Sequence, residues 1–443
     1  MFLITIFPIL IIISIFFSSN QSENFISFDF TTELNSSNEK KHFFESFFPS
    51  HNIIIKIKIG TPLQKIPLVL RSNNYNTAIS SSSMKNFENT IKFNENESST
   101  FKTSNISSHY IYNEFSLAMD GRDKLEIEKN KIINNFSFLL IKEMNVSLSG
   151  LIGLKLVEVY MTNDFNFIQQ LKGKKLIKEI VYFVLYDNKK DFEGKFFIGS
   201  YPHEIFNDEN YNEKNFIFVK AGINKNQIDY VLNFDNIFTY SVNLRNTRCL
   251  IRYEFGFILG SKEYQILIET HYFKDKLFEE KKCFKYVFLG KYLTFYCNKN
   301  EIDKKEFKNI KFFLHDFNFN FVFDFDDLFY LKDNFYYFLI VFDLDSDNNF
   351  HWILGMPFIK KYLIVFDLDK KIIGFYNNNI IIKNGKNNIF FYVFWYIFLI
   401  GIIIVLVFYI LRFVYFKKNK RIIANELNEG IYYVQQKDNY LIN

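Results

Sequence analysis

Short stretches in the middle of the chain alternate between apolar and polar residues. From Asn52 to Gly60, isoleucine occupies every second position, and lysine fills two of the positions between. The stretch Phe317–Phe325 alternates in the same way, with phenylalanine at every second position. Because successive side chains of a strand point to opposite faces, this period of two predicts half-buried β-strands.

Further short apolar runs extend the pattern, and helical periodicity is scarce. Residues 195–200, 231–234 and 363–369 are predicted to be strands, while Phe165–Leu171 and Phe206–Tyr211 are each predicted to be a short helix. The acids at 324, 326 and 327 are assigned to the solvent-facing side of the phenylalanine-rich strand. The central part of the chain is therefore predicted to be mostly β.

Two long apolar runs lie near the ends of the chain. Met1–Phe17, followed by Ser18 and Ser19, is predicted to be a secretory signal peptide; because its positive n-region is missing, an uncleaved membrane anchor is the alternative. Ile389–Leu411 carries no charge and is long enough to cross a bilayer as a helix. Five basic residues between 412 and 421 follow it, which predicts a cytosolic C-terminus.

These two runs predict a single-pass, type I membrane protein of the secretory pathway. The sequence does not distinguish the cell surface from an endolysosomal or other vesicular membrane as its location. Six N-glycosylation signals begin at Asn20, Asn35, Asn96, Asn105, Asn135 and Asn145. All six precede the apolar run 389–411, so they fall on the predicted lumenal side, and we take the last five as candidate glycosylation sites.

Composition narrows the class of protein. Apolar residues make up 49% of the chain and charged residues 23%, which excludes disorder for most of its length. A net charge of +5 gives no electrostatic footprint of a nucleic-acid-binding protein. The chain has three cysteines and no CxxC or HExxH motif, so a disulfide-dense module and a zinc site are excluded, and no metal or cofactor is expected.

Four segments resemble, in the same order, motifs of the pepsin-like aspartic peptidases. They are Ile59-Gly-Thr-Pro-Leu-Gln64, Gly150-Leu-Ile-Gly-Leu154, Gly194-Lys-Phe-Phe-Ile-Gly-Ser200, and Trp352-Ile-Leu-Gly355 with Val365-Phe-Asp367 and Ile373-Gly-Phe375. The last match is the most specific, because several fixed residues rarely recur at such spacings by chance. Together the matches cover roughly residues 50 to 376.

The resemblance implies an all-β, bilobal pepsin-like double-ψ β-barrel fold, followed by one transmembrane helix. In that family each lobe contributes an Asp-Thr/Ser-Gly loop to the floor of a cleft that holds an extended peptide. The family also closes a disulfide at the place of Cys283 and Cys297 in the second lobe, which leaves Cys249 as a buried free thiol.

These expectations divide the chain into seven parts. They are a signal peptide (1–19), an N-terminal extension (20–50), an N-terminal lobe (51–220), a C-terminal lobe (221–376), a juxtamembrane linker (377–388), a transmembrane helix (389–411) and a cytosolic tail (412–443).

The chain departs from the family at the catalytic positions. The family's first aspartate stands nine residues after the proline of its IGTP motif, and nine residues after Pro62 is Arg71. In the second lobe, Cys249–Leu259 resembles the segment around the other aspartate, whose position is taken by Arg252. The family's chemistry needs two carboxylates that share one proton, and a guanidinium group can replace neither.

No nearby acid restores the pair. Residues 46–87 contain no Asp or Glu, and Glu254 alone is not a dyad. We expect Glu254 to form an ion pair with Arg252, because buried charge requires a partner. The family's flap sequence is also replaced, and Tyr112 is the candidate for its tyrosine.

Three functions are compatible with these residues. The leading interpretation is a catalytically inactive homologue that binds extended peptides in the retained cleft. The alternatives are an active aspartic endopeptidase, if the loop alignment is wrong, and a structural or adhesive surface glycoprotein. The arginines are either an anion-binding site or the result of drift after catalysis was lost, and the oligomeric state is open.

Overall fold

The computed structural model describes the central part of the chain and a helix near its C-terminus. The described residues are 25–32, 43–44, 52–84, 90–111, 114–128, 131–155, 164–187, 190, 192–224, 227–239, 242–345, 352–376, 399–403 and 405–419. The chain divides into two compact units, residues 1–379 and 380–443. The predicted signal peptide and most of the predicted cytosolic tail lie outside the described residues.

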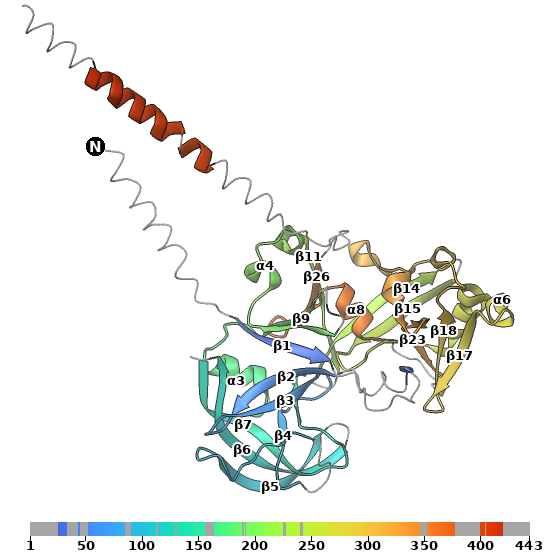
Figure 1. The fold of residues 1–443 in the computed structure, drawn as a ribbon. Helices are drawn as coiled ribbons and strands as arrows, with labels where there is room; N and C mark the ends of the chain where they lie inside the picture. The colour runs from blue at the N-terminus through green and yellow to red at the C-terminus, as the bar shows by residue number, and fades with distance from the viewer. Residues whose placement is uncertain are drawn as a thin grey trace, which may run out of the picture. The chain divides into compact units, whose positions relative to one another are not determined.

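The first group of elements, the first lobe, runs from β1 to α4 (Figure 1). It consists of β1 (Ile26–Thr32), β2 (Ile53–Ile59), β3 (Gln64–Arg71), β4 (Ala78–Ser80), β5 (Lys102–Ile111), β6 (Glu114–Glu128), β7 (Lys131–Glu143), β8 (Gly150–Gly153), α3 (Phe167–Gly173), β9 (Val181–Tyr186), β10 (Glu193–Ile198) and α4 (Pro202–Ile205).

The second group, the second lobe, runs from β14 to α8. It consists of β14 (Val231–Thr239), β15 (Val242–Ile251), β16 (Ile258–Gly260), α5 (Lys262–Leu267), α6 (Lys274–Glu279), β17 (Cys283–Phe288), β18 (Tyr292–Asn298), β19 (Ile310–Leu314), β20 (Phe319–Phe323), α7 (Phe325–Leu328), β21 (Phe329–Lys332), β22 (Phe335–Phe338), β23 (Ile340–Asp343), β24 (Trp352–Leu354) and α8 (Met356–Lys361).

The remaining strands join the lobes or form a small hairpin. Strands β11 (Phe216–Lys220), β25 (Val365–Asp367) and β26 (Ile372–Tyr376) continue the sheet of the first lobe, in the order β11-β26-β25-β9-β10-β1-β2. Strands β12 (Gly222–Asn224) and β13 (Gln227–Asp229) pair with each other. Strand β25, which follows the second lobe in the sequence, therefore pairs with β9 of the first lobe.

The two lobes repeat one strand arrangement. In the first lobe β3 is parallel to β8, β8 is antiparallel to β4, and β4 is parallel to β7. In the second lobe β15 is parallel to β24, β24 is antiparallel to β16, and β16 is parallel to β23. This duplication confirms the all-β, bilobal architecture that the sequence predicts.

Alternating side chains form the predicted strands. In β2 the isoleucines at 53, 55, 57 and 59 are buried, while Lys56 and Lys58 are exposed. The predicted strands within 195–200, 231–234 and 363–369 correspond to β10, β14 and β25. The helix predicted at Phe165–Leu171 is confirmed as α3, which begins after Asn166 because that side chain accepts a hydrogen bond from Gln169 N–H.

The prediction for Phe317–Phe325 is correct only for its centre. Strand β20 spans Phe319–Phe323; before it, a 3₁₀ turn ends at Asn318, whose left-handed backbone reverses the chain. After it, the Asp324 carboxylate accepts a hydrogen bond from Asp327 N–H and caps α7. The acids assigned to a strand therefore belong to a helix and its cap. Of the helix predicted at 206–211, only a 3₁₀ turn at Glu209–Tyr211 forms.

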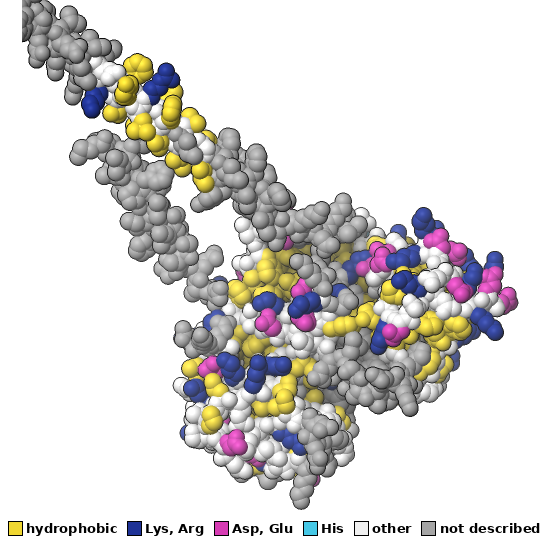
Figure 2. Space-filling model, in the orientation of Figure 1, with side chains coloured by type: hydrophobic (Ala, Val, Ile, Leu, Met, Phe, Trp, Pro, Cys, Tyr) yellow, Lys and Arg dark blue, Asp and Glu magenta, His cyan; other side chains and the backbone are white. Residues whose placement is uncertain are grey.

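One described helix, Leu399–Asn419, is long and apolar enough to cross a membrane. Its apolar side chains are exposed along its length, and Figure 2 shows them as a hydrophobic surface with basic side chains toward one end. The predicted span 389–411 begins outside the described residues. Its described part lies within this helix, which supports the prediction of a membrane-spanning segment.

Candidate functional site

The loops after β3 and β15 occupy equivalent places in the two repeats. Arg71, the last residue of β3, lies opposite Gly153 in the parallel pair with β8. Ile251, the last residue of β15, lies opposite Leu354, the last residue of β24. Arg252 and Gly355 are the next residues after these two strands. The β-sheet register thus gives Arg71 and Arg252 corresponding positions, independently of any sequence motif.

Each loop rests against the glycine that follows the paired apolar strand. A Cβ atom on Gly153 would lie 2.4 Å from the carbonyl carbon of Tyr75. A Cβ atom on Gly355 would lie 2.2 Å from the carbonyl oxygen of Phe255. Because both distances are far below van der Waals contact, a larger residue at either position would displace the loop.

Arg71 is held inside the first lobe. Its side chain is buried, with 6% of the residue exposed, and its Nη2 donates a hydrogen bond to Asn52 Oδ1 at 2.8 Å. Asn52 stands directly before β2, so the start of that strand positions the guanidinium group. No sequence motif predicts this contact, because nothing in the spacing of Asn52 and Arg71 indicates that they meet.

Glu254 forms the expected ion pair with Arg252 and has a second, unexpected partner in the other lobe. Arg252 Nη1 lies 3.9 Å from Glu254 Oε1, which is beyond hydrogen-bond distance. Glu254 Oε2 instead accepts hydrogen bonds from Ser72 N–H at 3.2 Å and from Ser72 Oγ–H at 2.7 Å. The expected ion pair is therefore present without a hydrogen bond, and the same carboxylate also joins the loop of the second lobe to that of the first.

Buried tyrosines lie next to the second loop. The hydroxyl groups of Tyr182 and Tyr230 are hydrogen-bonded to each other, and Tyr230 also donates to the carbonyl oxygen of Leu154 at 2.7 Å. The ring of Tyr253 packs against those of Tyr182 and Phe366. Burial raises the pKa of Tyr182 and of Tyr253 well above the ordinary tyrosine value, so both hydroxyls stay neutral.

The two loops carry little acid–base chemistry. A guanidinium group stays protonated and can only donate hydrogen bonds, so neither arginine can take a proton from water. Glu254 contributes one carboxylate, and one of its oxygens already accepts two hydrogen bonds from Ser72. Among the described residues, no three His, Cys, Asp or Glu side chains gather as a metal site.

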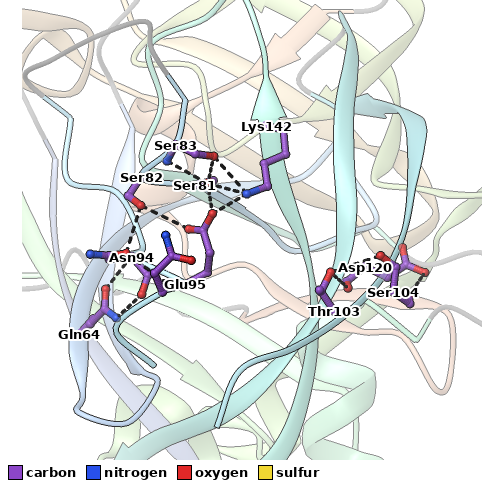
Figure 3. A network of polar contacts seen from close by, with 11 residues as sticks. Gln64, Ser81, Ser82, Ser83, Asn94, Glu95, Thr103, Ser104, Asp120 and Lys142 are labelled. Atoms are coloured by element: carbon purple, nitrogen blue, oxygen red, sulfur yellow. Dashed lines mark hydrogen bonds and ion pairs between the residues drawn. The ribbon is translucent and has the colours of Figure 1, made fainter. Parts of the chain in front are cut away.

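A second polar network lies in the first lobe, at the end of β4 (Figure 3). The Glu95 carboxylate accepts hydrogen bonds from Lys142 Nζ and from Ser81 Oγ–H, and Lys142 also donates to Ser83 Oγ at 3.1 Å. Burial raises the pKa of Glu95, but the hydrogen bonds from Lys142 and Ser81 outweigh it and leave the pKa below its ordinary value. Lys142 and Ser81 thus both donate to Glu95, and Lys142 joins the carboxylate to Ser83.

The cysteine predictions are confirmed. Cys283 and Cys297 face each other in the β17–β18 hairpin and form a disulfide. Cys249 is a buried free thiol, and burial raises its pKa well above the ordinary value, which makes it a poor nucleophile.

The remaining candidate residues are only partly described. Asn96, Asn135 and Asn145 are exposed, as glycosylation requires. Asn20, Asn35 and the side chain of Asn105 lie outside the described part of the chain, as does the flap candidate Tyr112.

Comparison with known proteins gives one family. The family described as eukaryotic aspartyl protease matches residues 52–377, well over half of the chain. No curated protein with which the chain was compared matches it. The matched residues include both repeats and both loops described above, and the chain belongs to the eukaryotic aspartyl protease family.

Proposed function

We propose that this protein is a membrane-anchored member of its family that binds extended peptides and does not hydrolyse them. The observation that carries the proposal is the presence of arginine at the corresponding positions of both repeats, Arg71 and Arg252. The family's mechanism needs two carboxylates that share one proton, and these loops offer a single carboxylate, that of Glu254. Peptide binding by strand addition uses main-chain groups, so it does not depend on the missing acids.

Hydrolysis is the direct test. The full-length protein in detergent is incubated with a quenched-fluorescent peptide library from pH 3 to pH 7, with and without pepstatin. We expect no pepstatin-sensitive hydrolysis by the wild type at any pH. Such hydrolysis would show that the protein is an active peptidase and would overturn the proposal.

Binding is tested on the same library. We expect fluorescence polarisation to show saturable binding of labelled peptides to the wild type. An Arg71→Asp/Arg252→Asp variant, which places a carboxylate at each of the two positions, is assayed beside it for hydrolysis. If neither binding nor hydrolysis is found for a folded wild type, the protein is a structural or adhesive surface protein and the peptide-binding proposal fails.

The proposal places the two lobes in the lumen of the secretory pathway. It is supported by the apolar helix Leu399–Asn419 and by the exposure of the asparagines at 96, 135 and 145. Removal of N-linked glycans should increase the electrophoretic mobility of the cell-derived protein. A C-terminal tag should be digested by protease added outside sealed microsomes; a protected tag would contradict this orientation.

A further inference from the structure

Glu254 takes part in the contact between the lobes. Its Oε2 accepts both hydrogen bonds from Ser72, and its Oε1 is the atom that lies 3.9 Å from Arg252 Nη1. The carboxylate is 7% exposed, so it has little freedom to turn toward the arginine without losing Ser72. It therefore pairs with the charge of Arg252 at 3.9 Å and leaves the N–H donors of the guanidinium group without a hydrogen bond from this carboxylate.

The Arg252 guanidinium group has donors available for a ligand. Within the described part of the chain it makes no hydrogen bond, and 18% of the side chain is exposed to solvent. A guanidinium group carries five N–H donors in a planar fork, and a largely buried one is stabilised by an acceptor that fills the fork. An anion that reaches this loop would find both the charge and the donors.

The two arginines differ in accessibility although they correspond in the fold. Arg71 is only 6% exposed, and its Nη2 is hydrogen-bonded to Asn52. Arg252 is the more exposed of the two, and it belongs to the second lobe. The structure therefore favours a site built on one arginine over the two-arginine clamp considered from the sequence.

We propose that Arg252 binds a carboxylate group of the peptide ligand, so that the protein selects acidic peptides. This inference rests on the proposed function, because it names the ligand chemistry of the same site. A carboxylate presents two coplanar oxygens that match the guanidinium fork, and Asp or Glu side chains and the C-terminus supply it in a peptide. The neutral carboxamides of Asn and Gln have the same shape but offer one oxygen and no charge.

The experiment measures peptide selection by the full-length protein in detergent. Labelled octapeptide pools, each with Glu, Gln or Lys fixed at one position and mixed neutral residues elsewhere, are compared by fluorescence polarisation. We expect at least one Glu-fixed pool to bind about tenfold more tightly than its Gln-fixed partner, the size of one charge-assisted hydrogen-bonded contact. The Lys-fixed pool at that position should bind most weakly.

Variants assign the preference to one residue. Arg252→Gln should bind the Glu and Gln pools equally, and Arg252→Lys, which keeps the charge without the fork, should retain part of the preference. Arg245→Gln is the matched control, because Arg245 is an exposed residue of β15, the strand that leads into the loop of Arg252, and it should keep the full preference. Circular dichroism and thermal melting establish that each variant is folded.

The outcomes separate this inference from the proposed function. If peptides bind but Glu and Gln pools do not differ, or if the difference survives in Arg252→Gln, the carboxylate site is wrong and peptide binding stands. If no pool binds to the folded wild type, both proposals fail. If Arg252→Gln does not fold, Arg252→Lys decides: an unchanged preference would contradict the need for the guanidinium fork.

Discussion

Ser72 and Glu254 lie 182 residues apart in the sequence and are joined by two hydrogen bonds to a single carboxylate oxygen. Ser72 follows Arg71, and Glu254 lies two residues after Arg252, so the contact connects the two corresponding loops directly. A carboxylate that accepts hydrogen bonds from a main-chain N–H and a hydroxyl group of another lobe is a strong, directional link. It therefore fixes one loop relative to the other.

Removing this link should destabilise the protein. Glu254→Ala leaves the Ser72 N–H and hydroxyl without their acceptor, and a buried donor that loses its partner costs about 1 to 3 kcal/mol. Glu254→Gln keeps an acceptor oxygen and should cost less. Urea denaturation measures both, with Glu301→Ala as the control at an exposed acid. Equal stability of Glu254→Ala and the wild type would show that the link contributes nothing.

The network around Glu95 predicts a loss of stability in acid. Because the pKa of Glu95 is lowered in the folded protein, its contribution is present above the pKa of the unfolded chain and is lost as the pH falls through the folded value. Glu95→Gln should therefore destabilise the protein at neutral pH and weaken its loss of stability in acid. Denaturation at pH 7 and pH 4 measures both effects.

A double-mutant cycle tests the pairing itself. If Lys142 is the main partner of Glu95, the variants Glu95→Gln and Lys142→Met should together cost clearly less than the sum of the single changes. Additive costs would mean that the two side chains act independently.

The sequence locates the two arginines but not their partners. The motif that ends at Gln64 and the segment Gly150–Leu154 bracket Arg71, and the sheet register agrees with that alignment. The pairing of Glu254 with Arg252 was inferred from their proximity in the sequence, which gives no information about the direction of either side chain. That ion pair forms, but the residue that donates hydrogen bonds to the carboxylate is Ser72, which comes from the other repeat and is brought close only by the folded arrangement.

The phenylalanine-rich segment shows a second limit. Apolar residues occupy every second position throughout 317–325. This pattern alone does not reveal the turn at Asn318 or the helix cap at Asp324. Both residues are of types that favour those roles, and an acid three residues after Asp324 completes a capping box. Turn and cap signals would therefore have shortened the predicted strand correctly.

The N-terminal segment contributes two phenylalanines to the second lobe. Phe43 stacks on Tyr330 with ring centroids 5.3 Å apart, and Phe44 stacks on Phe288 at 5.8 Å. Because both rings are buried, Phe44→Ala should destabilise the protein by about 3 kcal/mol, the lower end for a buried phenylalanine. Phe218→Ala is the control, since that ring is 54% exposed and should cost little. Equal costs in thermal denaturation would mean that the segment does not anchor on this lobe.

Asp327 predicts a pH dependence of the opposite sign to that of Glu95. Burial raises its pKa to about 6 and outweighs the lowering effect of Lys361, with which it forms an ion pair. Between its unfolded value near 4 and this folded value, the native state binds more protons than the unfolded chain, so stability falls as the pH rises from 4 to 6. The effect should amount to roughly 2 to 3 kcal/mol.

The variant Asp327→Asn isolates this contribution. Asparagine cannot ionise, so the variant lacks this loss of stability. Its unfolding free energy should therefore rise relative to that of the wild type between pH 4 and pH 6, and the difference should stay constant above pH 6. Asp326→Asn is the control, because that neighbouring carboxylate is exposed and makes an ion pair with Lys304 at the surface. Parallel pH profiles for the wild type and Asp327→Asn would show that Asp327 titrates at the same pH in the folded and unfolded chains.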